Sequence, residues 1–440
     1  MNAWPSRLLS LAATHAVVLR RAIRLGTFLL PLASGAVAGA GTIPVAHIQW
    51  MTRIGAPIYN PPRVSGGVIY LDTAQAQGAN VFAVQNGHIL WRFATRGAIE
   101  MPVTLGGSQV FVASDIGGTH FMRALSQRTG RLVWNYQRGQ PAECMCSHII
   151  HYAHRLLFAQ TDGHGLYAFY PRGNLPTHRL WAFAGDGAKL TPPVVANQMV
   201  LVGSGDHCLY ALARHTGKVV WKQATGYAFV AQPAIWRNII IVGNRGGTVH
   251  AYAVNTGTPL WSFSTNGPID TSAVPYGNLV FVAAGKGDRG VYALSAHTGK
   301  QIWYAPMADY TDYAPAVVDT TLIVASRDGD ALGINPVNGK VRWSTKLGGV
   351  PFSPPVVMGH AVVLKVGDHR LVSLSARTGS IQWAYHTRAV ITTPVVESGA
   401  AGAGLMPSMP AMPGMKMPEQ PRRLTSVYIG TSSGKLLALD

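Results

Sequence analysis

A short pattern of a small residue, a glycine and a tryptophan recurs along almost the whole chain. In its clearest copy, Ala211 is followed by Gly217 at the seventh position and Trp221 at the eleventh. The frame returns at Ala124, Gly130 and Trp134, at Ala251, Gly257 and Trp261, at Ala293, Gly299 and Trp303 and, with another first residue, at Gly333, Gly339 and Trp343 and at Ser373, Gly379 and Trp383. A pattern repeated in this way is typical of proteins that stack one structural unit many times.

Each copy of the pattern predicts a β-hairpin. Residues 209–213 alternate in character, a turn with Thr216 and Gly217 follows, and residues 218–221, Lys-Val-Val-Trp, form a second short strand. The glycine supplies the positive φ of the turn. A tryptophan brings a large apolar face and an N–H group that needs a hydrogen-bond partner. We therefore expect one docking tryptophan between each pair of adjacent units, at Trp50, Trp91, Trp134, Trp181, Trp221, Trp261, Trp303, Trp343 and Trp383.

The spacing of these tryptophans predicts a unit of four strands. From Trp91 to Trp383 they follow one another at intervals of about 40 to 47 residues, which four strands of ~5–6 residues and their turns fill. Residues 47–50 form a lone final strand, while 426–430 and 435–439 supply the second and third strands of a unit without a fourth. The chain is therefore expected to form an all-β, closed β-propeller over residues 39–440, whose last blade is completed by the N-terminal strand.

These repeats resemble the PQQ-like (quinoprotein-type) β-propeller, whose tryptophan-docking motif has Ala, Gly and Trp at the first, seventh and eleventh positions. The resemblance covers residues 48–440 and implies eight blades, whereas a strict count of the units gives nine, so the expectation is eight with nine open. The family includes quinone-dependent dehydrogenases, the propeller lipoprotein of the bacterial β-barrel assembly machinery, and the tetrathionate hydrolase of acidophiles. The resemblance therefore implies a fold and leaves the function to the site.

The N-terminus predicts export to the periplasm. Arginines such as Arg20 and Arg21 precede the apolar run 25–32, and Ala36-Val-Ala38 has the form of a cleavage site, so residues 1–38 are expected to be an export signal. An uncleaved anchor is the alternative, although the run is shorter than the ~20 residues of a bilayer span. Whether the Sec or the twin-arginine route is used stays open. No cysteine follows the run, so we expect no lipid anchor, unlike the barrel-assembly lipoprotein.

The charge balance is strongly basic. Lys and Arg number 36 against 18 for Asp and Glu, which gives a net charge of +18. With few ionised acids to protonate, little stability is lost when the pH falls, so an acidic compartment is expected. The positive charge suits a small anion or a peripheral contact with an anionic membrane surface. Nucleic acid is not expected for an exported chain, and the ring is expected to be monomeric.

Two segments hold candidate metal ligands. The first is Cys144-Met-Cys146-Ser-His148, in which alternate residues would share one face of a strand and suit Cu(I) or Zn(II). The alternative is a loop whose cysteines oxidise in an exported protein. With Cys208 as a third thiol, at least one cysteine lacks an intramolecular partner and could be reactive.

The second segment is a Met- and Pro-rich insertion in the last unit, at residues 398–423. Thioethers select Cu(I), and Pro and Gly keep the chain extended, so copper or silver binding is one interpretation. A compositionally biased loop without a ligand is the other. The candidate ligands are Met406, Met409, Met412, Met415 and Met417.

The residues favour a non-enzymatic binding or assembly scaffold, with Cu(I) binding by the Met-rich loop. The resembling dehydrogenases use a vicinal cysteine pair and a carboxylate-bound calcium, whereas this chain has no adjacent cysteines and only four Glu, so no PQQ is expected. The alternative is a sulfur-oxyanion hydrolase of the tetrathionate hydrolase kind, with an Asp near a blade turn that activates water. No catalytic residue is assigned, because these aspartates can equally serve to make the turns: Asp206, Asp288, Asp328 and Asp368.

Overall fold

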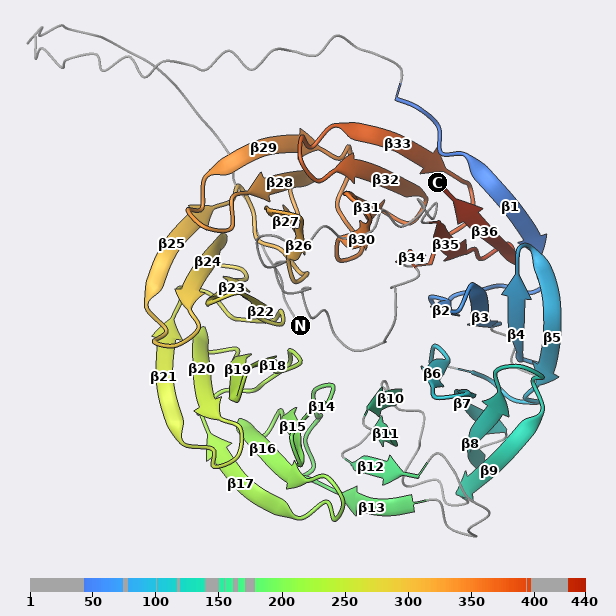
Figure 1. Cartoon of the computed structure of the whole chain (residues 1–440), viewed down its shortest axis with the longest axis horizontal. Coiled ribbons are helices and arrows are strands. Elements are labelled where there is room, and N and C mark those ends of the chain that lie inside the picture. The colour runs from blue at the N-terminus through green and yellow to red at the C-terminus, as the bar shows by residue number, and fades with distance from the viewer. Residues whose placement is uncertain are drawn as a thin grey trace, which may run out of the picture. The chain divides into compact units, whose positions relative to one another are not determined.

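The structure, a computed structural model, is a ring of nine antiparallel four-stranded sheets (Figure 1). The described part of the chain contains strands and no helix. It comprises residues 43–73, 78–99, 101–116, 119–138, 150–153, 155–160, 165–170, 179–392, 394–396 and 426–440. The predicted closed β-propeller is confirmed, and the blade number left open between eight and nine is nine.

In blades 1 to 8 the strands follow chain order from the innermost to the outermost, whereas in blade 9 the outermost strand is β1 (Figure 1). Blades 1 to 3 are β2 (Arg63–Ser65), β3 (Val68–Asp72), β4 (Asn80–Gln85) and β5 (His88–Ala94); β6 (Thr104–Gly106), β7 (Gln109–Ile116), β8 (Thr119–Ser126) and β9 (Leu132–Arg138); β10 (Ile150–Ala153), β11 (Leu156–Gln160), β12 (Leu166–Phe169) and β13 (Arg179–Phe183). Blades 4 to 6 are β14 (Val194–Ala196), β15 (Met199–Gly203), β16 (Cys208–Ala213) and β17 (Val219–Ala224); β18 (Ala234–Trp236), β19 (Ile239–Gly243), β20 (Thr248–Ala253) and β21 (Pro259–Ser264); β22 (Val274–Tyr276), β23 (Leu279–Ala283), β24 (Gly290–Ser295) and β25 (Gln301–Pro306). Blades 7 to 9 are β26 (Ala316–Val318), β27 (Thr321–Ala325), β28 (Asp330–Ile334) and β29 (Val341–Lys346); β30 (Val356–Met358), β31 (Ala361–Val366), β32 (Arg370–Ser375) and β33 (Ile381–His386); β34 (Val395–Val396), β35 (Val427–Gly430), β36 (Lys435–Leu439) and β1 (Ile48–Arg53).

Blade 9 is assembled from both ends of the described chain, as predicted. β1 pairs antiparallel with β36, with Thr52 opposite Leu436. The backbone N–H of Ile54 donates to the Gly434 carbonyl at 2.8 Å beyond the strand end. This pairing supplies the fourth strand of the last sheet and joins it into the ring (Figure 1).

The hydrophobic core is a series of layers between neighbouring blades. In β15, Val200, Leu201 and Val202 are all buried, although successive side chains of a strand point to opposite faces. Val200 and Val202 pack in a cluster with Phe158 of blade 3. Leu201 packs on the other side in a cluster with Ile240 of blade 5. Each sheet is therefore covered on both faces, which explains why the middle strands are apolar throughout.

The tryptophan of the repeat contacts the next blade around the ring. The Trp221 indole N–H donates to the Val254 carbonyl at 2.9 Å. Its ring lies against Gly257, where an added Cβ would come within 2.6 Å of the indole. The same pair of contacts joins Trp91 to Gln127 and Gly130, Trp181 to Arg214 and Gly217, Trp261 to Ala296 and Gly299, Trp303 to Pro336 and Gly339, and Trp343 to Ala376 and Gly379.

The other three predicted docking tryptophans lie in the outer strands β1, β9 and β33. Trp50 lies beside Gly87, where an added Cβ would be at an ordinary contact distance of 3.5 Å. Trp134 is buried and its ring centroid lies 6.0 Å from that of Phe111. Trp383 is buried in the cluster of blades 8 and 9.

The small first residue of the repeat lies opposite the tryptophan of its own blade. Ala211 pairs with Trp221 in the β16–β17 register. In blade 7 this position is Gly333, where a Cβ would come within 2.1 Å of the Trp343 indole. The repeat therefore needs a small residue because the indole lies across it.

Candidate functional site

The predicted metal ligands lie outside the described residues. Cys144, Cys146 and His148 belong to the segment between β9 and β10, and Met406, Met409, Met412, Met415 and Met417 to the segment between β34 and β35. Among the residues that the structure does describe, no group of three or more His, Cys, Asp or Glu could hold a metal ion.

Cys208, the third thiol, is a free cysteine at the start of β16 and is only 6% exposed. Burial raises the pKa of the Cys208 thiol, and the neighbouring charge of Asp206 raises it further. Because the thiolate is the reactive form, this environment suits a structural cysteine better than a nucleophile.

The four aspartates considered for catalysis all hold local structure. Tyr210 and Tyr292 donate hydroxyl hydrogen bonds to two of them, and burial is the main cause that raises the pKa of both phenols, so both remain donors. The remaining partners are backbone N–H groups, a lysine and the Tyr304 hydroxyl, which donates to Asp288 Oδ1 at 3.3 Å. The contacts are Asp206 with Cys208 N (2.9 Å) and Tyr210 (2.5 Å), Asp288 with Asn266 N (2.8 Å) and Tyr292 (2.7 Å), Asp328 with Asp330 N (3.1 Å), and Asp368 with Lys365 (3.0 Å).

A buried carboxylate that sequence reasoning missed lies at the end of β3. Asp72 is 2% exposed, and its Oδ1 accepts a hydrogen bond from Asn60 at 2.8 Å. Its Oδ2 has no hydrogen-bond partner among the described residues. Burial raises the pKa of Asp72 to about 7, against the opposing effects of the Asn60 hydrogen bond and the Arg63 charge. Nothing in the sequence around Asp72 distinguishes it from an exposed turn aspartate.

The ring has two distinct faces, because the turns of an antiparallel blade alternate between the two ends of its strands. The turns from first to second strand and from third to fourth strand open on one face, here named the hairpin face. In blade 4 these turns meet where Arg214 N donates to the Gln198 carbonyl at 2.8 Å. The turns from second to third strand and the links between blades open on the other face, the connection face. There Gly205 N donates to the Lys189 carbonyl at 2.8 Å.

The charges are distributed unequally between these faces. All the Lys or Arg ion pairs within the described residues lie on the connection face: Lys222–Asp186, Arg245–Asp270, Arg289–Asp309, Arg327–Asp312, Lys346–Asp330 and Lys365–Asp368. The hairpin face has cations from blade 2 to blade 8 that form no ion pair within the described part: Arg128, Arg131, Arg155, Arg179, Arg214, Lys218, Arg237, Lys300, Lys340, Arg342 and Arg377.

Only two described aspartates lie on the hairpin face, and each contacts a histidine there. Asp319 is 2.8 Å from His360, and Asp440 is 2.9 Å from His47. Among the described residues, the excess of positive charge is therefore concentrated on the hairpin face, where few carboxylates compensate it.

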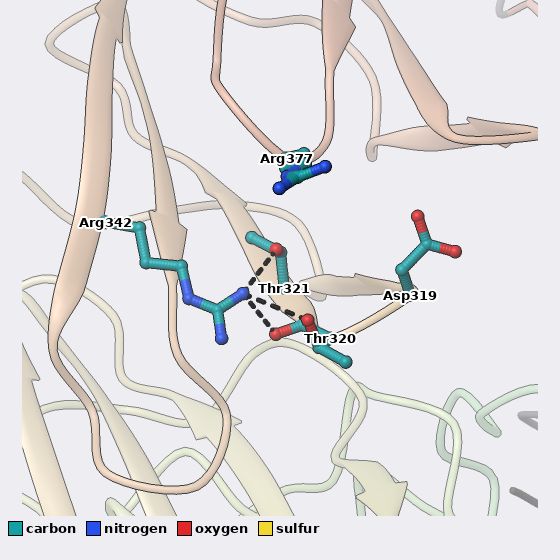
Figure 2. Close-up of a pocket in the computed structure, with 5 residues that line it drawn as sticks. All are labelled: Asp319, Thr320, Thr321, Arg342 and Arg377. Atoms are coloured by element: carbon teal, nitrogen blue, oxygen red, sulfur yellow. Dashed lines mark hydrogen bonds between the residues drawn. The ribbon is translucent and has the colours of Figure 1, made fainter.

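A pocket of about 320 Å3 opens on the hairpin face between blades 7 and 8. Figure 2 shows Arg342 and Arg377 on two sides of it, with the Thr320 and Thr321 side chains between them and Asp319 opposite. One guanidinium nitrogen of Arg342 donates to the Thr320 carbonyl (2.7 Å) and to the hydroxyls of Thr320 (3.2 Å) and Thr321 (2.9 Å). These bonds fix the cation in place, and its other nitrogens can receive an anion such as a phosphate.

The connection face presents a patch of exposed apolar side chains over blades 7 to 9 and blade 1. This connection patch consists of Tyr59, Val350, Phe352 and Val390, which are 58%, 37%, 45% and 38% exposed. Their backbone is held in place: Phe352 N donates to the Lys365 carbonyl at 2.7 Å and Val390 N to the Ser432 hydroxyl at 3.0 Å. Apolar side chains exposed on a fixed backbone are typical of protein interfaces.

The described part of the chain also lacks any helix with the length and hydropathy of a bilayer span.

Solved structures confirm the fold by comparison. BamB from Moraxella catarrhalis superimposes with a TM-score of 0.53 at 15% identity, over 90% of this chain and 100% of that chain. A europium-containing methanol dehydrogenase gives a TM-score of 0.52 at 13% identity, over 88% and 85% of the two chains. The computationally designed Ika8 protein gives 0.54 at 14% identity, over 76% and 99%. At these identities the likeness concerns the fold alone.

Comparison of the amino-acid sequence with known proteins matches one kind of relative, outer membrane protein assembly factor BamB. Outer membrane protein assembly factor BamB of Burkholderia pseudomallei (strain K96243) is 28% identical over 111 residues, which are 25% of this chain and 29% of the relative. BamB of Nitrosomonas eutropha (strain DSM 101675 / C91 / Nm57) is 24% identical over 143 residues, 32% and 30% of the two chains. The matches thus span about a third or less of the relatives' length.

A family profile matches a much larger part of this chain than these individual relatives do. The profile described as outer membrane protein assembly factor BamB matches residues 49–177, 123–234, 174–309, 206–349 and 287–440. These overlapping matches run through all nine blades. The chain therefore belongs to the BamB family of PQQ-like β-propellers.

Proposed function

We propose that this protein is a non-enzymatic scaffold of the periplasm that binds protein partners during outer membrane protein assembly. The observation that carries the proposal is the match of the BamB family profile from residue 49 to residue 440. The turn contacts of Asp206 and Asp288 also support a scaffold over a hydrolase, because these carboxylates are engaged by backbone and tyrosine donors.

The docking site of this scaffold is the connection patch. Phe352 and Val390 are exposed side chains on backbone that is already hydrogen-bonded, so a partner can bury them with little cost in backbone entropy. Around the patch, Lys365 and Asp368 form an ion pair, and Arg388 is an exposed cation. An apolar centre with a polar rim is the usual anatomy of a protein interface.

The test is outer membrane protein assembly in cells that lack the chain. Folded β-barrel protein in the outer membrane is measured after complementation with the full chain or with the double variant Phe352→Ser/Val390→Ser. The control is Tyr227→Ser/Val230→Ser, which removes an aromatic and a valine that are exposed on the same face, in the link between blades 4 and 5 and outside the connection patch. The proposal expects the wild type and the control to restore assembly and the patch variant to fail at normal protein abundance. Full assembly without the chain would reject the scaffold function.

Cu(I) binding by the Met-rich segment is a second proposal, supported by the spacing of its five methionines. Titration with Cu(I) against a bicinchoninate competitor tests it. The chain with all five changed to leucine is expected to lose the sites, and changing Cys144, Cys146 and His148 to serine tests the other candidate ligands. Equal Cu(I) uptake by the leucine variant would exclude the loop. The methionines are Met406, Met409, Met412, Met415 and Met417.

A further inference from the structure

We propose that the hairpin face docks onto an anionic phospholipid bilayer and so orients the ring, with the connection face directed away from the membrane. The inference goes beyond the scaffold function and does not depend on the identity of a protein partner. It rests on the distribution of charge over the two faces.

The cations of the hairpin face are available to an external partner. Arg128, Lys218, Lys300 and Arg377 are exposed residues of the turns between third and fourth strands, and none forms an ion pair among the described residues. The connection face also has exposed cations without an ion pair, such as Lys189 and Arg388. It differs in its carboxylates, because it holds every described aspartate except Asp319 and Asp440, and six of its cations pair with one of them. A uniform excess of positive charge would not produce this difference, whereas an anionic ligand for one face explains it.

The spread of these cations favours a bilayer over a compact or linear anion. They occur in seven consecutive blades, from Arg128 in blade 2 to Arg377 in blade 8, and the corresponding turns follow one another around the ring (Figure 1). A membrane surface presents phosphates over an area, so it can engage all of these turns at once. A nucleic acid backbone would need the charges along one track.

Two further features fit a headgroup layer. The pocket between blades 7 and 8 offers the fixed Arg342 and the facing Arg377, which suit one phosphate (Figure 2). Val337, at the tip of the turn between β28 and β29, is 68% exposed. An apolar side chain at the tip of a basic surface can enter the interfacial region while the cations contact phosphates.

The test compares two charge-matched variants of the full chain in vesicle co-sedimentation. The hairpin-face variant is Arg128→Gln/Lys218→Gln/Lys300→Gln/Arg377→Gln. The connection-face variant removes two arginines and two lysines that are also exposed and form no ion pair within the described residues: Arg96→Gln/Lys189→Gln/Lys286→Gln/Arg388→Gln. The probes are phosphatidylcholine vesicles with and without phosphatidylglycerol, and the pure phosphatidylcholine vesicles give the background.

The wild type is expected to bind the phosphatidylglycerol vesicles, and salt should weaken that binding. The hairpin-face variant should bind on the order of a hundredfold more weakly, because each cation near an anionic surface contributes separately. The connection-face variant should lose only a few-fold. Equal losses in both variants, or no binding by the wild type above background, would overturn the proposal. Tighter binding of a single-stranded oligonucleotide through the same residues would assign the face to nucleic acid instead. The vesicle assay contains no protein partner. A failure of membrane binding therefore does not decide whether the chain acts as an assembly scaffold, which the test in cells measures separately.

Discussion

At the scale of single residues, the contact between blades depends on a glycine beneath an indole. Gly257 has a φ of +70°, and a Cβ there would come within 2.6 Å of the Trp221 ring. The indole also donates to the Val254 carbonyl in the same turn. The repeated turn therefore combines a backbone conformation and a close approach that only glycine allows.

The variant Gly257→Ala should therefore lower the free energy of unfolding by ~3 kcal/mol, from backbone strain together with overpacking. The matched control is Gly226→Ala, since Gly226 has a φ of +79° and no atom within 4 Å of an added Cβ. The control should lose only the strain contribution of ~1 kcal/mol. Denaturant unfolding of both variants measures the difference, and equal losses would show that the indole contact adds nothing.

The buried carboxyl group of Asp72 makes the free energy of unfolding depend on pH. Burial raises its pKa in the folded chain to about 7, above the ordinary value that applies when the chain is unfolded. Between those two values the folded state holds a proton that the unfolded state releases, so stability falls as the pH rises through this window. The contribution of Asp72 to stability is therefore fully present below its ordinary pKa and is lost as the pH rises to about 7.

The variant Asp72→Asn should remove this dependence. Its unfolding free energy, relative to that of the wild type, should increase by roughly 4 kcal/mol from about pH 4 to above pH 7. Asp319→Asn, at a half-exposed turn aspartate, serves as the control and should leave the wild-type slope in place. Parallel pH profiles for wild type and Asp72→Asn in thermal or denaturant unfolding would contradict the assignment.

At the scale of strands, the ring depends on β1. Its pairing with β36 covers Leu436 and Leu437, which are buried in the closed ring. Residues ahead of β1 add a second connection, since Ala46 N donates to the Ala384 carbonyl of β33 at 3.0 Å. The N-terminal strand thus holds blades 8 and 9 together.

Removal of residues 1–53 should open the ring at this place. We expect a melting temperature lower by roughly 10 °C or more, and association of chains through the exposed edge of β36. The control lacks only residues 1–42 and retains β1. Calorimetry and size-exclusion chromatography distinguish the two, and a monomeric, equally stable 1–53 deletion would show that β1 does not close the fold.

Much of this architecture is visible in the sequence, because the frame of Ala211, Gly217 and Trp221 encodes one hairpin and its contact. The sequences Thr191-Pro-Pro and Ser353-Pro-Pro directly precede the innermost strands β14 and β30, because proline is tolerated at the start of a strand. The sequence leaves the blade number open between eight and nine, because a strict count of the units gives nine whereas the family resemblance implies eight. The structure has nine, in agreement with the count of the units.

At the scale of the whole molecule, the two-faced charge distribution could not be read from net charge. It follows from the alternation of turns, which places the Lys222–Asp186 pair on one face and Lys218, four residues away, on the other. The Arg342 pocket also needs tertiary structure, because it joins one outer strand to the turn ahead of β27. Asp72 was missed because its burial depends on the packing of a blade, not on its neighbours in sequence.

We expect the two faces to have different contacts in the cell: a protein partner at the connection patch and lipid at the hairpin face. A photo-reactive amino acid at position 352 probes the connection patch, and one at position 337 probes the hairpin face. Both positions are exposed, so neither substitution is expected to disturb the ring.

The most direct measurement is photo-crosslinking in living cells from these two positions. The scaffold account predicts a discrete protein adduct in the cell envelope from position 352, which disappears with Val390→Ser, and no protein adduct from position 337. A protein adduct from position 337 together with none from position 352 would contradict it.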